Sequence, residues 1–100
     1  MHTVALKEVT VIAEALLEDK LLRELRELGA RGFTIADVRG EGSRRLRDDE
    51  WEGRRVRVET LVGAEVADRI LQHLAEHYFP HYSMVAYVAD VQVVRREKYV

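Results

Sequence analysis

Apolar residues follow two different periods along the chain, and these predict strands and helices in alternation. Residues 4–13 are apolar at most positions, which predicts a strand buried on both faces, beginning near Lys7. Leucines then recur three or four positions apart over residues 17–28, with charged residues between them. This spacing predicts an amphipathic helix, and Gly29, directly after the last leucine, is typical of a helix C-terminus.

Three further strands and a second helix are predicted downstream. Strands are expected over residues 33–39, 56–62 and 83–94, and a helix over 64–78 that ends before Pro80. The order is β-α-β-β-α-β, which predicts a ferredoxin-like α+β fold in one domain, 1–100, with both helices on one face of an antiparallel sheet. Because the other face needs a partner, we expect an oligomer.

The longest polar segment lies between the second and third predicted strands. Residues 40–53 hold three of the six glycines and many charged residues. Loops of this length in compact domains are usually functional or disordered. We expect a mobile loop over about 41–54 and a short charged tail over 95–100.

The first half of this loop has the residue types of an anion site. It contains, in order, Gly40, Gly42, Ser43, Arg44, Arg45 and Arg47. Glycines let backbone amides approach a ligand, and arginine forks match phosphate or carboxylate oxygens. Acidic residues then surround Trp51, a residue type that often marks a binding contact. The alternative is a solvated hairpin tip with scattered charges.

Three histidines and a group of aromatic residues offer other chemistry. His73 and His77 share a helical face and could chelate a metal, but Pro80 separates them from His81. Exposed or half-buried helix histidines are the preferred interpretation, so no metal ligand is assigned. The aromatic residues are expected to pack in the core or between subunits rather than to stack on bases. They are Tyr78, Phe79, Tyr82 and Tyr87.

Composition narrows the function classes. Sixteen basic against 18 acidic residues give a net charge of −2, which argues against a dedicated nucleic-acid binder. The absence of cysteine excludes disulfides, iron–sulfur clusters and thiol catalysis. No apolar run reaches the roughly 20 residues of a membrane span, and no signal peptide is visible. We expect a cytoplasmic protein, not inserted in a membrane, without a prosthetic group and without a catalytic constellation.

Two stretches resemble a known family. Residues 29–42, GARGFTIADVRGEG, resemble the second-strand region of PII signalling proteins, which leads into their long T-loop. Residues 40–47, GEGSRRLR, are similar to the PII-like branch linked to bicarbonate uptake and carboxysomes. The region from residues 77–80 through 86–88 also resembles that branch, and the likeness extends over nearly the whole chain.

The resemblance implies a homotrimer that binds adenine nucleotides in clefts between subunits, with a T-loop that responds. AMP, ADP, cyclic AMP and ATP are the implied effectors, with bicarbonate as a hypothetical co-ligand. Ser43, Arg44 and Arg47 would hold the phosphates. Thr34 and the backbone near Gly40 and Gly42 would line the cleft, and Arg95 would reach it from a neighbour. The implied partner is a bicarbonate transporter in the membrane or a carboxysome protein.

Two departures from the family pattern modify this expectation. Residues 76–83, EHYFPHYS, contain no glycine where standard PII proteins carry a glycine-rich phosphate loop. This argues against ATP with 2-oxoglutarate and against nitrogen control, and favours a smaller ligand set. The lack of cysteine excludes the redox latch of some bicarbonate-transporter regulators.

Two other function classes remain open at this stage. A trimeric divalent-metal-binding protein of similar fold, resembling the divalent-cation tolerance proteins, is supported only by the fold and the histidines. A small nucleotide hydrolase would need a base and a metal-binding carboxylate on rigid backbone. The available acids, at positions 48–50 and 52, lie in the long loop instead.

Overall fold

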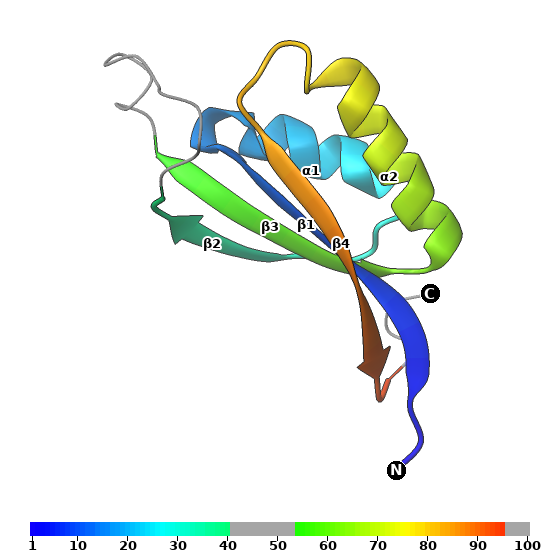
Figure 1. The fold of residues 1–100 in the computed structure, drawn as a ribbon. Helices are drawn as coiled ribbons and strands as arrows, with labels where there is room; N and C mark the ends of the chain where they lie inside the picture. Colours follow the sequence, from blue (N-terminus) through cyan, green and yellow to red (C-terminus); the bar gives the residue numbers. More distant parts are fainter. Residues whose placement is uncertain (41–53, 96–100) are drawn as a thin grey trace.

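A four-stranded antiparallel sheet carries both helices on one face (Figure 1). The computed structural model describes residues 1–40 and 54–95 of the chain. The strands are β1 (Val4–Glu14), β2 (Thr34–Val38), β3 (Arg55–Val62) and β4 (Val85–Val93). The helices are α1 (Glu18–Glu27), which follows a 3-10 turn at Ala15–Leu17, and α2 (Ala64–His77). The order across the sheet is β2-β3-β1-β4, so the predicted ferredoxin-like α+β fold is confirmed.

The core lies between the sheet and the two helices. Val9, Val11 and Ala13 of β1 lie opposite Thr60, Val58 and Val56 of β3, respectively, and all six side chains are buried. Leucines of α1 and the apolar stripe of α2 cover them. Burying each such side chain contributes about 1.5–3 kcal/mol, which explains why the two helical stripes face the sheet.

Gly29 ends α1 as the leucine spacing predicted. Its φ is +122°, in the region that favours glycine, and its N–H donates to Arg26 O at 3.0 Å. A Cβ added there would lie 2.9 Å from Val66 Cγ2 at the start of α2. Glycine at this position therefore permits both the turn and the close approach of the two helices.

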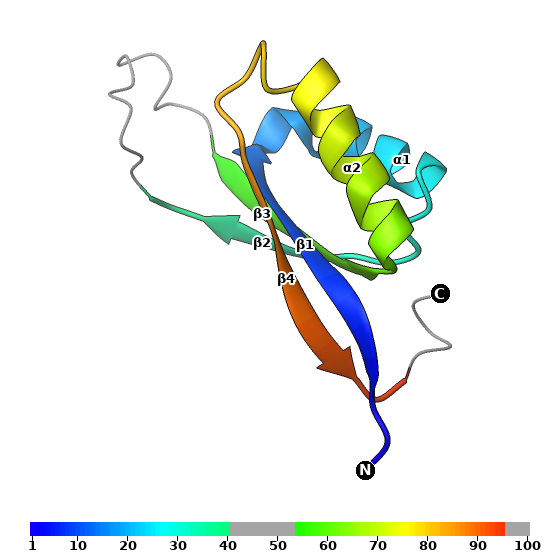
Figure 2. The same cartoon turned by 45° about the vertical axis from the view of Figure 1, so that its right-hand side comes forward.

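The first strand begins earlier than its hydrophobic pattern predicted. β1 starts at Val4 rather than near Lys7, because its first residues pair with the end of β4, where Val4 lies opposite Val93. These ends form a two-stranded ribbon that extends beyond the helices (Figure 2). Because this ribbon extends beyond the helices, the alternation of apolar and polar residues near Leu6 did not show where the strand starts. β2 and β4 are each shorter than predicted, and α2 ends one residue early.

The sheet face opposite the helices, called here the open face, mixes charged and apolar side chains. Strand register places Thr34, Glu59, Thr10 and Tyr87 in one row and Ala36, Arg57, Ile12 and Val85 in the next. Tyr87 and Val85 are about half exposed in the single chain. No helix among the described residues is long and apolar enough to cross a membrane.

Candidate functional site

The segment that holds most of the predicted anion-binding residues joins two neighbouring strands of the sheet. β2 ends at Val38, which lies directly opposite Arg55 at the start of β3. The end of β2 and the start of β3 are therefore adjacent (Figure 1). Four of the predicted ligand residues lie outside the described residues, together with the whole acidic half of the loop. These four are Gly42, Ser43, Arg44 and Arg47.

The described ligand candidates fall at opposite ends of the sheet. Thr34 is exposed at the start of β2, opposite Glu59, and Gly40 follows the end of the same strand. Arg95 comes two residues after Val93, the end of β4, which pairs with Val4, the first residue of β1. The 11 residues of β1 separate this end from the corner of the loop by about 33 Å. Thr34 and Gly40 therefore lie about 20 Å apart along one extended segment, and one chain leaves Arg95 remote from Gly40.

One backbone hydrogen bond and one side-chain hydrogen bond fix the start of β3, where the long loop ends. Arg54 O accepts the N–H of Ala15 at 2.6 Å, and Arg55 Nη2 donates to Ser83 O at 2.9 Å. The sequence analysis did not identify Arg55, which in the sequence is only a polar position on a predicted strand. Its Nε is buried and meets no acceptor within the described part of the chain.

A second arginine lies on the open face beside Arg55. Arg57 is two residues further along β3, and its Nε is 3.5 Å from Glu59 Oε2. That Nε is also buried and makes no hydrogen bond to any described residue, because the geometry is poor. Buried guanidinium atoms usually find an acceptor, and the carboxylate of Glu59 is the charged group beside this one. Both arginines alternate with buried valines along β3. This period of two was the sequence signal that could have placed them on the open face.

The two histidines predicted to share a face of α2 lie side by side, and each has a carboxylate neighbour. The rings of His73 and His77 lie 4.6 Å apart, but His73 Nε2 is 2.7 Å from Glu24 Oε1. Across residues 1–40 and 54–95, no group of three or more His, Asp or Glu side chains is placed to hold a metal ion. His81 lies beyond the helix, as Pro80 predicted.

Glu24 is the second residue that sequence reasoning missed. Its Oε1 also accepts the hydroxyl of Tyr78 at 2.7 Å. Burial alone would raise the pKa of the Glu24 carboxyl, but hydrogen bonds from His73 and Tyr78 and the charges of His73 and Lys20 lower it below its usual value. Burial and the Glu24 carboxylate raise the pKa of the Tyr78 hydroxyl. The carboxylate therefore stays ionised and joins α1 to the end of α2.

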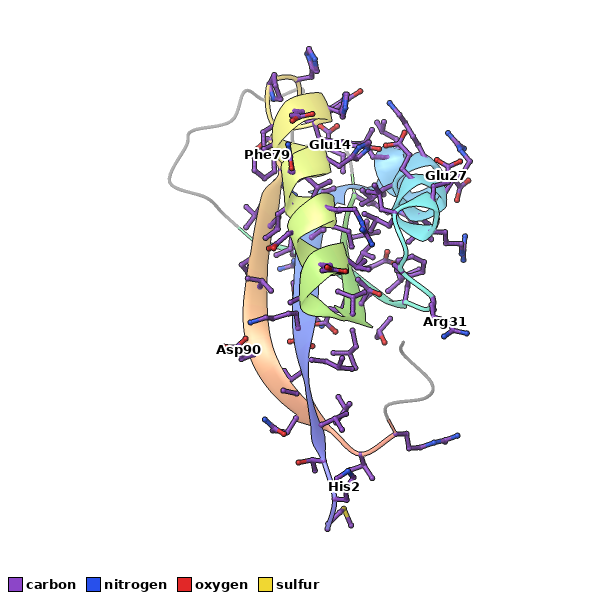
Figure 3. The ribbon with its side chains drawn as sticks, turned by 90° about the vertical axis from the view of Figure 1, so that its right-hand side faces the viewer. His2, Glu14, Glu27, Arg31, Phe79 and Asp90 are labelled. Carbon is purple, nitrogen blue, oxygen red and sulfur yellow. The ribbon has the colours of Figure 1, made fainter. Side chains whose placement is uncertain are left out.

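The aromatic residues divide between the core and the surface. Tyr78 is fully buried and Tyr82 packs against the core, with ring centroids 5.9 Å apart, which agrees with a packing role. Phe79 and Tyr87 are 44% and 50% exposed in the single chain. Figure 3 places Phe79 at the same end of the sheet as Glu14, and His2 at the other end.

Comparison with known proteins places these features in a family. The family model of the nitrogen regulatory protein P-II matches residues 6–98. A crystal structure of a candidate PII-like signaling protein from Thermus thermophilus is 58% identical, with 100% of both chains covered and a TM-score of 0.86. CPII from Thiomonas intermedia K12, bound to ADP, AMP and acetate, is 25% identical over 99% of this chain and 98% of that one, with a TM-score of 0.86.

A further structure of CPII from Thiomonas intermedia K12, bound to ADP and bicarbonate, supports the fold. It is 24% identical over 99% of this chain and 98% of that one, with a TM-score of 0.85. The likeness in each case extends over both the sheet and the helices, since nearly the whole chain is covered.

Proposed function

This chain belongs to the nitrogen regulatory protein P-II family, and we propose that it is a trimeric signalling protein, not an enzyme, that binds an adenine nucleotide between its subunits. One observation carries the proposal. The arginine-rich loop leaves and re-enters the sheet at one corner, where Val38 lies opposite Arg55. A ligand bound at that corner can therefore hold the loop in one arrangement, which turns binding into a signal.

A trimer is supported by features that one chain leaves incomplete. PII-like proteins are generally trimeric. The open face holds half-exposed Val85 and Tyr87, which a neighbouring copy would cover. Arg95 lies about 33 Å along the sheet from the loop corner, so it can contribute to the cleft only from another copy.

Adenine nucleotides are the proposed effectors because two lines of support agree. CPII, which is 25% identical, is bound to ADP and AMP. Ser43, Arg44 and Arg47 supply hydroxyl and guanidinium donors suited to phosphate oxygens. Thr34 and the backbone at Gly40 and Gly42 would line the same cleft. AMP, ADP, cyclic AMP and ATP are all candidates for the physiological ligand.

A small carboxylate-like co-ligand fits the same chemistry. The structure of CPII at 25% identity also holds acetate, and bicarbonate shares its planar pair of oxygens. We propose bicarbonate as the co-ligand and control of inorganic-carbon handling as the role, through a bicarbonate transporter or a carboxysome protein that contacts the T-loop. If bicarbonate leaves nucleotide affinity unchanged in a titration, the co-ligand part of the proposal is wrong.

A subunit-mixing experiment tests the position of the cleft. Arg47→Ala and Arg95→Ala chains should each bind ADP weakly as homotrimers. Trimers reassembled from a mixture of the two should regain tight sites, because some clefts then hold both arginines, one from each chain. Arg69→Ala, an exposed arginine of α2, is the matched control. Mixed trimers that bind no better than either parent would contradict a site shared between subunits.

A further inference from the structure

One carboxylate oxygen of α1 holds the end of α2. Glu24 Oε1 lies 2.7 Å from Tyr78 Oη and 2.7 Å from His73 Nε2. An ionised carboxylate only accepts hydrogen bonds, so both neighbours are donors and the Nε2 of His73 carries a hydrogen. Tyr78 is fully buried, and a polar group buried in this way depends on its partner. The hydrogen bond from its hydroxyl to Glu24 therefore fixes the position of Tyr78 relative to α1.

Tyr78 in turn fixes the segment that leads to β4. Its carbonyl oxygen accepts the N–H groups of His81 and Tyr82, both at 2.9 Å. At the far end of this segment, Ser83 O accepts the hydrogen bond from Arg55 Nη2. The turn between α2 and β4 is thus anchored at both ends by side chains from other elements, Glu24 of α1 and Arg55 of β3.

This turn lies at the end of the sheet that carries the proposed cleft. Ile12 of β1 pairs with Val85, the first residue of β4, so the turn lies near the end of β1. Arg55, opposite Val38, lies at the same end, where the long loop leaves the sheet. Figure 1 shows the turn before β4 and the adjoining ends of β2 and β3 on this side of the molecule.

We propose that Glu24 is a positioning residue for nucleotide binding: it holds Tyr78, and through Tyr78 the turn over residues 78–83, in the arrangement that the cleft requires. This inference rests on the proposed function. Glu24 itself does not touch the ligand. Its loss should loosen the turn and weaken nucleotide binding without dissociating the trimer.

The surroundings of Glu24 make this arrangement sensitive to charge. Lys20 and Arg23 of α1 face the cluster, and Lys20 Nζ lies 5.3 Å from the centroid of the Tyr78 ring. His73 and His77 approach it from α2, with Glu76 beside His77. Tyr82 and His81 approach from the turn. Removing the negative charge of Glu24 leaves this mainly basic and aromatic group without its central acceptor.

Two conservative variants and one matched control test the proposal. Glu24→Gln keeps the shape of the side chain without its charge, and Tyr78→Phe removes only the hydroxyl. Glu76→Gln makes the same charge change on the exposed face of α2, where the carboxylate contacts Gln72 and His77 rather than Tyr78. His73→Gln is the rescue variant, since its amide N–H can still donate to Glu24. Hydrogen exchange at the amides of His81 and Tyr82, without ligand, reports the turn. Titration with ADP reports the cleft, and light scattering reports the trimer.

The expected result has three parts. Glu24→Gln and Tyr78→Phe should lose protection at His81 and Tyr82 and should bind ADP about three- to tenfold more weakly, the scale of one hydrogen bond. Glu76→Gln should match the parent, and His73→Gln should lie between.

Two outcomes would overturn the inference and are distinguishable from failure of the proposed function. Unchanged amide protection in both variants would show that Glu24 does not hold the turn. Lost protection with unchanged ADP affinity would show that the turn does not serve the cleft. If the parent protein binds no ADP, the proposed function fails, and the cleft-positioning role fails with it. Should Tyr78→Phe not fold, Glu24→Gln alone decides among these outcomes.

Discussion

Arg55 and Ser83 connect two parts of the fold that lie 28 residues apart in the sequence. The Arg55 Nη2 atom donates to the Ser83 carbonyl oxygen at 2.9 Å, across the sheet end where the long loop rejoins β3. The turn before β4 is therefore linked to the base of the loop. A displacement of one of these segments can therefore be transmitted to the other through the Arg55 side chain.

Arg55→Ala should loosen both ends of that link. The loss of one hydrogen bond with a charged donor predicts destabilisation by about 1.5–3 kcal/mol, because the Ser83 carbonyl is then left without this donor. Urea unfolding followed by circular dichroism measures the change. Arg54→Ala is the matched control, because Arg54 is exposed and contributes its backbone oxygen to the contact with Ala15. Equal stability of the two variants would show that the Arg55 side chain does not support the fold.

The free energy of unfolding should decrease at both acid and alkaline pH, because Glu24 and Tyr78 each contribute to it in only one protonation state. The pKa of Glu24 is lowered in the folded state, so its contribution is present above about pH 4.5 and is lost as pH falls through the folded pKa. The pKa of Tyr78 is raised, so its contribution is present below about pH 10 and is lost as pH rises through the folded pKa.

Thermal unfolding between pH 3 and 11 measures this dependence. Glu24→Gln should remove the part of the acid limb that Glu24 contributes, and Tyr78→Phe should flatten the alkaline limb. The exposed Glu76→Gln variant serves as the control for the acid limb. An acid limb that is identical in Glu24→Gln and the parent would rule out the ionised carboxylate as its source.

Gly29→Ala should destabilise the chain far more than Gly32→Ala. Position 29 has a φ of +122°, and a Cβ there would lie 2.9 Å from Val66 Cγ2. We expect a cost of at least about 1 kcal/mol from the backbone alone. Position 32 has nothing within 4 Å of an added Cβ, so its substitution should be nearly neutral. Chemical denaturation of both variants compares them, and equal midpoints would contradict the close contact at Gly29.

Arg44→Ala and Arg47→Ala should each weaken nucleotide binding by about 1.5–3 kcal/mol, as expected for the loss of a charge-assisted hydrogen bond. Calorimetric titration with ADP measures this, with Arg69→Ala as the control. Deleting residues 48–52 should spare nucleotide affinity while removing partner binding. A collapse of nucleotide affinity on this deletion would place the acidic half of the loop in the pocket instead.

The sequence predicted the element order and the buried stripes because both depend on local periodicity. The leucines of α1 and the glycine after them specify the helix and its end with no reference to the rest of the chain. The start of β1 was misplaced because it is set by pairing between Val4 and Val93, which no local pattern reports.

The missed residues have the same explanation. Glu24 acquires its role from Tyr78, 54 positions away, and Arg55 from Ser83, 28 positions away. In the sequence, both are ordinary charged positions on the polar side of a helix or strand. Only the packing of α1 against α2, and of β3 near the turn before β4, brings each to its partner. The arrangement of Gly42, Ser43, Arg44 and Arg47 remains a prediction.

Calorimetric titration of the purified protein with AMP, ADP, ATP and cyclic AMP, each with and without bicarbonate, tests the central claim most directly. The account predicts saturable, micromolar binding of at least one adenine nucleotide, at up to one site per chain of a trimer. Tighter binding in the presence of bicarbonate would support the proposed co-ligand. The absence of binding heat with all four nucleotides, in a protein confirmed to be a trimer, would contradict the account. The arginine-rich loop would then serve another anion or none.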